Sequence, residues 1–283
     1  MRIILDTDFG DDIDDSFALY YLLKAMPESI SLVLSDFGQT EKRAELICNF
    51  LERCGRKDIP VGIGVNMEYR DPYIYKFFNK YELSSYPQVY ENGLMKAKEL
   101  IEENDDVVII AIGPTTNLAA LSEICEKAKD VPVYAMLGSV YSGYFGADKP
   151  DKEWNVFADV AATKKTLAFY KNLIIAPLDT CSLLQIEGES FNKFMSSATP
   201  VADDYKNWLT LGYHKDTDKT SVLYDTQPVY MVSDNSLLEY ETLPLICDDE
   251  GFFHVDEKGN NVKCALRWKD KEAYMDMLSK VYI

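Results

Sequence analysis

Short apolar runs rich in β-branched residues alternate along the chain with longer amphipathic stretches. Continuous apolar runs predict buried strands at residues 2–6, 31–35, 59–64, 107–112, 131–136 and 173–178. Apolar residues that recur every three or four positions predict helices at residues 14–26, 40–55, 117–129 and 159–172. This alternation is typical of an α/β fold with an open, mostly parallel, twisted sheet and helices on both faces.

The remaining segments carry weaker patterns. Residues 65–92 and 140–152 are rich in Tyr, Gly and Asp and are expected to be loops. Residues 188–224 are expected to form an insertion with one or two helices, and residues 269–283 a terminal helix. Because no Ser/Gly-rich linker divides the chain, we predict one domain over residues 1–283.

Composition indicates a protein with a substantial core and no membrane span. Hydrophobic residues make up 47% of the chain, yet no window approaches the ~20 apolar residues that a span requires. The first residues, MRIILDTDFG, become acidic after five positions and lack a small-residue cleavage site, so they do not resemble a secretory signal. We therefore expect a cytoplasmic protein.

The net charge of −18 narrows the choice of partners. Only 29 of the 283 residues are Lys or Arg, so the field around the protein repels phosphate groups. Nucleic acid and anionic membranes are thus not expected to bind. A small neutral molecule is the better candidate.

Six aspartates lie within ten positions directly after the first predicted strand: Asp6, Asp8, Asp11, Asp12, Asp14 and Asp15. Capping of the following helix would account for one or two of them but not for six. Carboxylates without neighbouring His or Cys favour a hard cation, Ca²⁺ or Mg²⁺. Further polar residues follow the second, fourth and fifth strands, where ligands of such sheets bind.

Here the sequence resembles a known family. ILDTDFGDDIDDSFAL is similar to the N-terminal signature of the inosine–uridine-preferring nucleoside hydrolases, with two more residues between the glycine and the last Asp pair. Four further stretches follow in family order: IGPTTNLAAL (112–121), MLGSV (136–140), EWNVFADVAA (153–162) and LYDTQPVYMV (223–232). The resemblance covers roughly residues 2–235 and implies a nucleoside hydrolase-like fold with a Rossmann-like core.

The resemblance also implies roles for individual residues. Calcium would be held by Asp8, Asp15, Asp225 and the carbonyl oxygen of Thr116. Asp8 would in addition be the general base. The substrate-binding residues implied are Asp14 and Asp36 near the ribose, Glu153 at the 5′-hydroxyl and Asn155 at the 3′-hydroxyl. The family also implies a nucleoside substrate and assembly as a homodimer or homotetramer.

These residue types suit hydrolysis of an N-glycosidic bond. A calcium ion chelates the 2′,3′-diol of a ribose and lowers the pKa of a water, and a carboxylate accepts the proton as that water attacks C1′. Positive charge develops on the sugar ring as the bond breaks. Nearby carboxylates then stabilise the transition state more than the ground state.

The chain departs from the family pattern where the nucleobase would lie. Tyr224 stands where many members carry a histidine that acts as acid, and the loop after the third strand lacks the usual His-Gly pair. Tyr224 is either a packing aromatic or a group that protonates or hydrogen-bonds the departing base, although a tyrosine with a pKa near 10 is a poor acid at neutral pH. His214 is the alternative acid, or else an exposed loop histidine.

Aromatic residues near the predicted site invite two interpretations, stacking on a base or packing against one another. They are Trp154, the group Tyr141, Tyr144 and Phe145, and the group Tyr73, Tyr75, Phe77 and Phe78. Asp11 and Asp12 fall in the longer signature and are assigned to the loop, with contact between Asp12 and water near the ion left open.

Three functions remain open at this point. The first is hydrolysis of ordinary ribonucleosides to ribose and free base. The second is hydrolysis of unusual ribosides, such as modified-base nucleosides or nicotinamide riboside, for which the absent histidines would be natural. The third is a catalytically silent protein that binds ribose or nucleosides.

Overall fold

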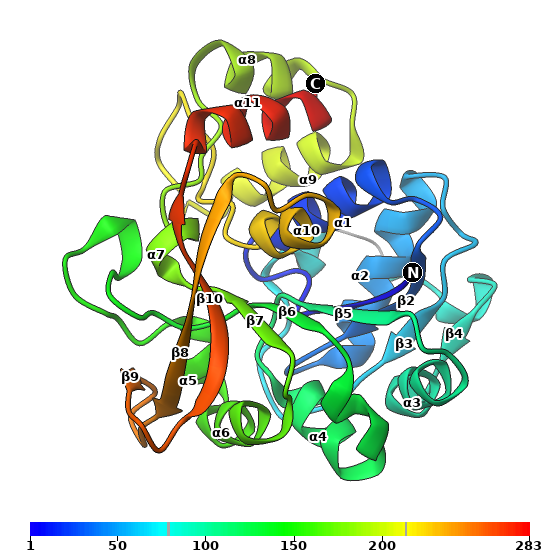
Figure 1. Ribbon diagram of the computed structural model, residues 1–283. Coiled ribbons are helices and arrows are strands. Elements are labelled where there is room, and N and C mark those ends of the chain that lie inside the picture. The colour runs from blue at the N-terminus through cyan, green and yellow to red at the C-terminus, as the bar shows by residue number, and fades with distance from the viewer. Residues whose placement is uncertain (78–79, 213) are drawn as a thin grey trace.

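The computed structural model describes residues 1–77, 80–212 and 214–283, so the predicted aromatic Phe78 lies outside the described residues. Within these ranges a ten-stranded sheet forms the centre of the molecule (Figure 1). The strand order is β4-β3-β2-β1-β5-β6-β7-β10-β8-β9. β1 is therefore central, with parallel neighbours β2 and β5 on its two sides.

Seven strands form the parallel part of the sheet: β1 Arg2–Thr7, β2 Ile30–Ser35, β3 Val61–Ile63, β4 Val89–Tyr90, β5 Val107–Ala111, β6 Val133–Met136 and β7 Leu173–Ala176. Three strands from the last part of the chain complete the sheet: β8 Leu238–Cys247, β9 Phe253–Val255 and β10 Asn260–Trp268. β10 runs parallel to β7 and antiparallel to β8, and β9 is antiparallel to β8. The expectation of an open, mostly parallel sheet is confirmed.

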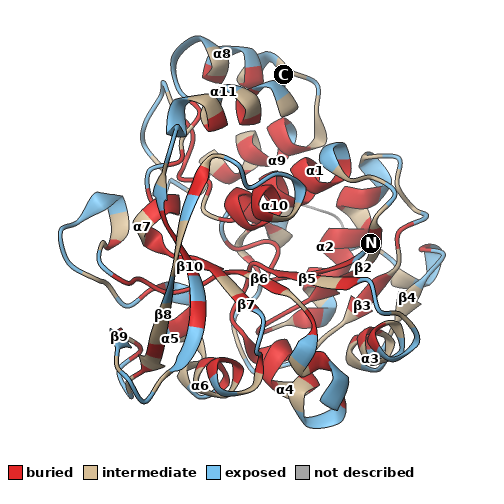
Figure 2. Cartoon of the chain, viewed as in Figure 1, coloured by how far each residue is buried: buried red, intermediate tan, exposed pale blue. Residues whose placement is uncertain are grey.

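Helices cover both faces of this sheet, as expected (Figure 1). One face is covered by α1 Asp14–Ala25, α2 Thr40–Arg53 and α10 Thr226–Ser233. Farther from the sheet on the same side, α8 Gly188–Ser196, α9 Pro200–Leu209 and α11 Lys271–Val281 pack on one another and on α1. The other face is packed by α3 Gly93–Glu103, α4 Thr116–Ile124 and α6 Val160–Phe169. The short helices α5 Trp154–Ala158 and α7 Leu178–Cys181 follow loops at the strand ends. Figure 2 shows that buried residues concentrate on the sheet and the helix faces turned towards it.

All six predicted strands are present, but the sequence analysis missed β8, β9 and β10 and placed β4 in a loop. β8 lies near the sheet edge, where buried and partly exposed positions mix and Pro244 interrupts the pattern. Such a strand lacks the continuous apolar run that identifies the central strands. The helix predicted over 117–129 is shorter, because α4 ends at Ile124 and a 3₁₀ turn, η3 Glu126–Asp130, follows.

Residues 188–224 contain two helices, α8 and α9, which join the main core. Phe17 of α1 packs against Phe194 of α8, Tyr205 of α9 and Tyr282, with ring centroids 5.1, 5.9 and 4.8 Å away. The α9 residue Trp208 donates its indole N–H to the backbone carbonyl of Asp11 at 3.3 Å. The segment thus helps to hold the polypeptide that follows β1. In the described ranges, no helix is both long enough and apolar enough to cross a membrane.

A buried arginine anchors that polypeptide from the other side. Arg43 of α2 is completely buried and donates to the backbone carbonyls of Phe37 at 2.7 Å and Phe9 at 3.1 Å, and to that of Asp8. Its guanidinium also pairs with the carboxylate of Asp11 at 2.8 Å. A buried charge is tolerated only when its donors are satisfied, and here three carbonyls and one carboxylate satisfy them.

Replacement of Arg43 tests this anchor. We expect Arg43→Met to lower the free energy of unfolding by about 3–5 kcal/mol, because three buried carbonyls lose their donor and Asp11 loses one of its two arginines. Equilibrium urea unfolding measures the change. The control is Arg267→Met, which removes an exposed arginine paired with Glu239 and Glu241 and should cost little. Equal losses in the two variants would refute the anchoring role.

Candidate active site

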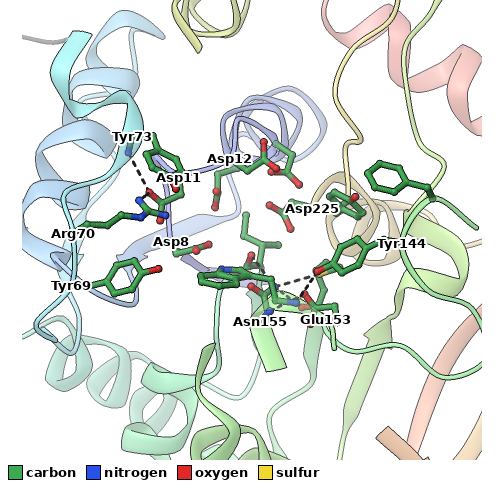
Figure 3. Close-up of a pocket in the computed structure, with 17 residues that line it drawn as sticks. Asp8, Asp11, Asp12, Tyr69, Arg70, Tyr73, Tyr144, Glu153, Asn155 and Asp225 are labelled. Carbon is green, nitrogen blue, oxygen red and sulfur yellow. Dashed lines mark hydrogen bonds and ion pairs between the residues drawn. The ribbon is translucent and has the colours of Figure 1, made fainter. Parts of the chain in front are cut away.

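The acid loop, residues 8–13, connects the carboxyl end of β1 to the start of α1. Because β1 is central, this loop opens at the middle of the sheet edge, where the loops after neighbouring strands converge. A cavity of about 550 Å³ lies there. Figure 3 shows the residues that line it: Asp8, Asp11, Asp12, Asp14, Asp15, Tyr69, Arg70, Tyr73, Ile112, Met136, Tyr144, Phe145, Glu153, Trp154, Asn155, Tyr224 and Asp225.

Three buried carboxylates form the most acidic part of the lining. One oxygen from each of Asp14, Asp15 and Asp225 lies within 4.8 Å of the other two. Burial raises the pKa of all three well above the ordinary value, and repulsion from the neighbouring acids adds to it. The hydroxyl of Thr7 donates to the Asp15 carboxylate. Oxygen donors this close, with no His or Cys among the described lining residues, fit a hard cation such as calcium.

Asp8 lies beside this cluster and projects into the cavity (Figure 3). Its backbone carbonyl is held by Arg43, and its side chain packs so closely on Gly113 that a Cβ there would lie 3.1 Å from Oδ1. Burial raises the pKa of Asp8 to about 7, with Arg43 opposing the shift and Asp11 adding to it. A bound cation would lower that pKa again. Asp8 is thus a carboxylate that the surrounding backbone holds in place beside the acidic cluster.

Glu153 and Asn155 are fixed at the start of α5, where Glu153 is the N-cap. The Glu153 carboxylate accepts backbone N–H groups from Gly138 at 2.9 Å, Asn155 at 2.8 Å and Val156 at 3.2 Å. The Asn155 amide donates to the carbonyl of Met136 at 2.9 Å. Burial raises the pKa of Glu153 to about 7 against these hydrogen bonds. Both side chains present rigid polar groups to the cavity.

Aromatic residues form two other walls, which Figure 3 shows on opposite sides of the cavity. Tyr69 and Tyr73 come from the loop after β3, and Tyr144 comes from the loop after β6. The Tyr144 hydroxyl accepts the backbone N–H of Trp154 at 2.8 Å, and its ring meets that of Tyr224 edge-on at 6.0 Å. Both loops expected from the sequence, 65–92 and 140–152, therefore contribute to the cavity.

Comparison with known proteins agrees with this geometry. The family model described as inosine–uridine preferring nucleoside hydrolase matches residues 3–276. The chain belongs to this family. By that membership it is an N-glycosyl hydrolase, and the resemblance seen in the sequence is confirmed.

Individual relatives are similar over most of the chain. The pyrimidine-specific ribonucleoside hydrolase RihA of Citrobacter koseri is 28% identical over 231 residues, which span 76% of this chain and 73% of that protein. RihA of Escherichia coli is 28% identical over 232 residues, with the same shares. These values show common descent.

Solved structures of nucleoside hydrolases share the fold. A plant nucleoside hydrolase superimposes with a TM-score of 0.80 at 19% identity and covers 99% of this chain and 98% of its own. A purine-preferring ribonucleoside hydrolase from Gardnerella vaginalis superimposes with a TM-score of 0.77 at 17% identity. The match covers 100% of this chain and 98% of that protein. The whole described architecture thus belongs to the nucleoside hydrolase fold.

Within this hydrolase the structure brings most of the predicted site residues into one cavity: Asp8, Asp14, Asp15, Glu153, Trp154, Asn155, Tyr224 and Asp225. Two other predicted residues, Asp36 and His214, lie outside the lining, and their roles stay predictions. Asp36 is fully buried, and one oxygen of its carboxylate accepts the backbone N–H of Phe37 at 2.8 Å. His214 also lies outside the lining, where its ring contacts Trp208 and a ring nitrogen bonds to the carbonyl of Lys219 at 3.0 Å.

Thr116 is buried at the start of α4 and does not line the cavity. Its hydroxyl donates to Asp159 at 2.9 Å. The role predicted for Thr116 involves its backbone carbonyl, and that role stays a prediction.

The sequence analysis missed Tyr69, Arg70, Ile112 and Met136, which line the cavity. Ile112 and Met136 sit within the family stretches, so their positions at strand ends were a usable signal. Tyr69 and Arg70 lie in a loop without periodicity, and no pattern in the chain marks them. Asp12 also lines the cavity, and its carboxylate accepts the N–H of Ile13 at 2.7 Å.

The buried acids predict an unusual dependence of stability on pH in the presence of a chelator. Burial raises the pKa of Asp6 and Asp8 to about 7 and that of Asp12 to about 6. When folding raises the pKa of an acid, ionisation of that acid at high pH destabilises the folded state. This loss of stability shrinks as the pH falls below the folded-state pKa and is gone near the unfolded-state pKa of about 4.

We therefore expect the melting temperature in EDTA to rise by ~2–4 °C or more between about pH 8 and about pH 5.5, measured by differential scanning fluorimetry. A hard cation bound by the ionised cluster would compensate its charge and flatten the profile, which repeating the scan in saturating calcium tests. The exposed Asp148 provides a control, since Asp148→Asn should leave the profile unchanged. A melting temperature that falls steadily from pH 8 would contradict the expectation.

Proposed function

We propose that this enzyme hydrolyses the N-glycosidic bond of ribonucleosides to give ribose and a free base, with calcium bound at the acidic end of the cavity. The observation that carries the proposal is the meeting of Asp14, Asp15 and Asp225 within 4.8 Å, next to Asp8 and in the same cavity as Glu153. Together these residues supply ligands for a hard cation, a general base for the reaction, and hydrogen-bonding groups for a sugar.

The residues that would hold the ion are those implied by the family resemblance: Asp8, Asp15, Asp225 and the carbonyl of Thr116. Asp14, which shares the cluster, would face a ribose hydroxyl. When bound, calcium would orient the ribose diol and acidify a water. The compact oxygen-only donor set supports this cation over zinc or copper.

The chain's own side chains would then act on the sugar and the water. Glu153 and Asn155, held by backbone groups, would bind the 5′- and 3′-hydroxyls. Asp8 would take a proton from the attacking water, and the surrounding carboxylates would stabilise positive charge as it develops near C1′. Burial of these groups strengthens each interaction, because less water screens it.

We propose the preferred nucleobase from the names of the relatives. The relatives from Citrobacter koseri and Escherichia coli are called pyrimidine-specific, so uridine and cytidine are the first substrates to test. A structural neighbour is called purine-preferring, and a cavity of about 550 Å³ also has room for inosine. Cytoplasmic location and assembly as a homodimer or homotetramer stay predictions.

A panel of ribosides tests the function. Uridine, cytidine, inosine and nicotinamide riboside are incubated with the calcium-loaded protein, and ribose is measured as reducing sugar with the free base resolved by chromatography. We expect release of ribose from at least one common nucleoside, and its loss in EDTA. Release only from nicotinamide riboside or modified nucleosides would favour the unusual-riboside alternative, and binding without release would favour the silent binder.

Asp8 supplies the matched test of mechanism. We expect Asp8→Asn to lower kcat by about 10²–10⁴-fold, because the attacking water loses its base. The exposed variant Asp148→Asn keeps the same change of charge away from the cavity and should retain activity. Full activity of Asp8→Asn would remove Asp8 from the reaction.

Tyr224 is the second catalytic candidate, and its place in the lining keeps both interpretations open. Burial raises the pKa of Tyr224 further above the ordinary value, which favours a hydrogen bond to the nucleobase over transfer of a proton to it. If Tyr224 assists departure of the base, Tyr224→Phe should lower kcat by about 10-fold on uridine or inosine and spare 4-nitrophenyl riboside, whose leaving group needs little help. If the parent enzyme and Tyr224→Phe cleave natural nucleosides at equal rates, Tyr224 only packs against its neighbours.

A further inference from the structure

One basic side chain stands in an otherwise acidic cavity. Among the described residues that line it, Arg70 is the only Lys, Arg or His. It comes from the loop after β3, which lacks the His-Gly pair of the family, and its side chain is 35% exposed. The positive charge of Arg70 affects which nucleobases can bind in the cavity.

Arg70 is held by a carboxylate that belongs to the longer acid loop of this chain. Its Nη1 pairs with Oδ1 of Asp11 at 2.6 Å, and the other oxygen of Asp11 pairs with the buried Arg43 at 2.8 Å. The N–H of Tyr73 also donates to Asp11 at 3.2 Å. Because Arg43 is fully buried and hydrogen-bonded to three backbone carbonyls, Asp11 ties Arg70 to the core.

Aromatic rings fix the plane of the guanidinium. Its central carbon lies 3.6 Å from the centre of the Tyr73 ring and 5.0 Å from that of Tyr69. Such stacking leaves the edges of the guanidinium able to donate hydrogen bonds. Partial burial disfavours the charged form, but the hydrogen bond and charge of Asp11 outweigh it, so the pKa of Arg70 is raised. Arg70 thus remains a cation throughout the working pH range.

The orientation of the sugar would place the base near this cation. This step rests on the proposed function, in which Glu153 binds the 5′-hydroxyl and Asp8 serves the water that attacks C1′. Figure 3 shows Glu153 and Asp8 apart along the cavity, with Arg70, Tyr69 and Tyr73 beyond Asp8 on the side away from Glu153. Because the water attacks C1′ on the face opposite the base, Asp8 does not fix the direction of the base. With the 5′-hydroxyl at Glu153, we place the base along the cavity against the wall of Arg70, Tyr69 and Tyr73.

We propose that Arg70 is a catalytic and specificity-determining residue that stabilises the nucleobase as it departs with negative charge. The C1′–N bond breaks and its electron pair stays on the nitrogen of the base. The water oxygen bonds to C1′ and its proton passes to Asp8, and solvent afterwards protonates the released base and restores Asp8. Arg70 transfers no proton and supplies charge where the family pattern would have a histidine.

This assignment selects a class of substrate. Uracil and hypoxanthine leave as anions with carbonyl oxygens that accept hydrogen bonds, so Arg70 stabilises their departure. The pyridinium base of nicotinamide riboside is positively charged in the substrate and leaves neutral. Arg70 repels it before the reaction and stabilises nothing afterwards.

The experiment compares Arg70→Gln with a matched variant of the same loop. Lys42 of α2 tethers this loop through Asp71 at 2.5 Å and does not line the cavity, so Lys42→Gln loosens the loop without removing the cavity cation. Rates of ribose release are measured for both variants on uridine, inosine and nicotinamide riboside. Thermal melting confirms that each variant is folded.

We expect Arg70→Gln to lower kcat/KM on uridine or inosine by about 10- to 100-fold and to raise it on nicotinamide riboside by about threefold or more. Arg70→Lys, which keeps the charge but not the planar fork, should recover part of the loss. Lys42→Gln should change all three substrates little.

Other outcomes separate the two proposals. A parent enzyme that releases ribose from no riboside overturns the proposed function. A parent enzyme that is active while Arg70→Gln is unchanged, or falls equally on all three ribosides, overturns only the role of Arg70. Equal losses in Arg70→Gln and Lys42→Gln would likewise show that the loop position matters and the charge does not.

Discussion

The structure depends on holding several carboxylates together, out of water, at the end of its central strand. Such groups repel one another and lose solvation, so their pKa values rise and the folded chain must compensate. Arg43 supplies part of the compensation from the core by binding three backbone carbonyls and Asp11. Among the remaining acids, one oxygen from each of Asp14, Asp15 and Asp225 lies within 4.8 Å of the other two, close enough for the three to share a hard cation.

That electrostatic arrangement gives the cavity two unlike ends. The acidic end, with Asp14, Asp15 and Asp225, suits an ion and a neutral polyol. The opposite wall combines Arg70 with tyrosine rings and suits a flat group that gains negative charge. Asp11 belongs to the acid loop yet binds the cation of the far wall, so a single loop organises both ends.

The sequence predicted the central fold well because its signals are local. A strand buried on both faces must be apolar throughout, and β1, β2 and β5 to β7 could each be recognised from a few consecutive residues. β8 could not, since its residues are partly exposed and their burial depends on which strands lie beside it. The same limit applied to β4, whose two residues form a strand only through pairing with β3.

The site divides along the same line. The sequence alone predicted that the acidic signature, Glu153 and Asn155 lie at one site, because family stretches specify residues a few positions apart that share one loop or helix start. Only the tertiary structure decided that Asp36 bonds to its own neighbour, that His214 lies outside the cavity, and that Arg70 enters it. The contact between Arg70 and Asp11 joins residues 59 positions apart. No local pattern encodes such a contact, because it forms only when packing brings two loops to the same edge of the sheet.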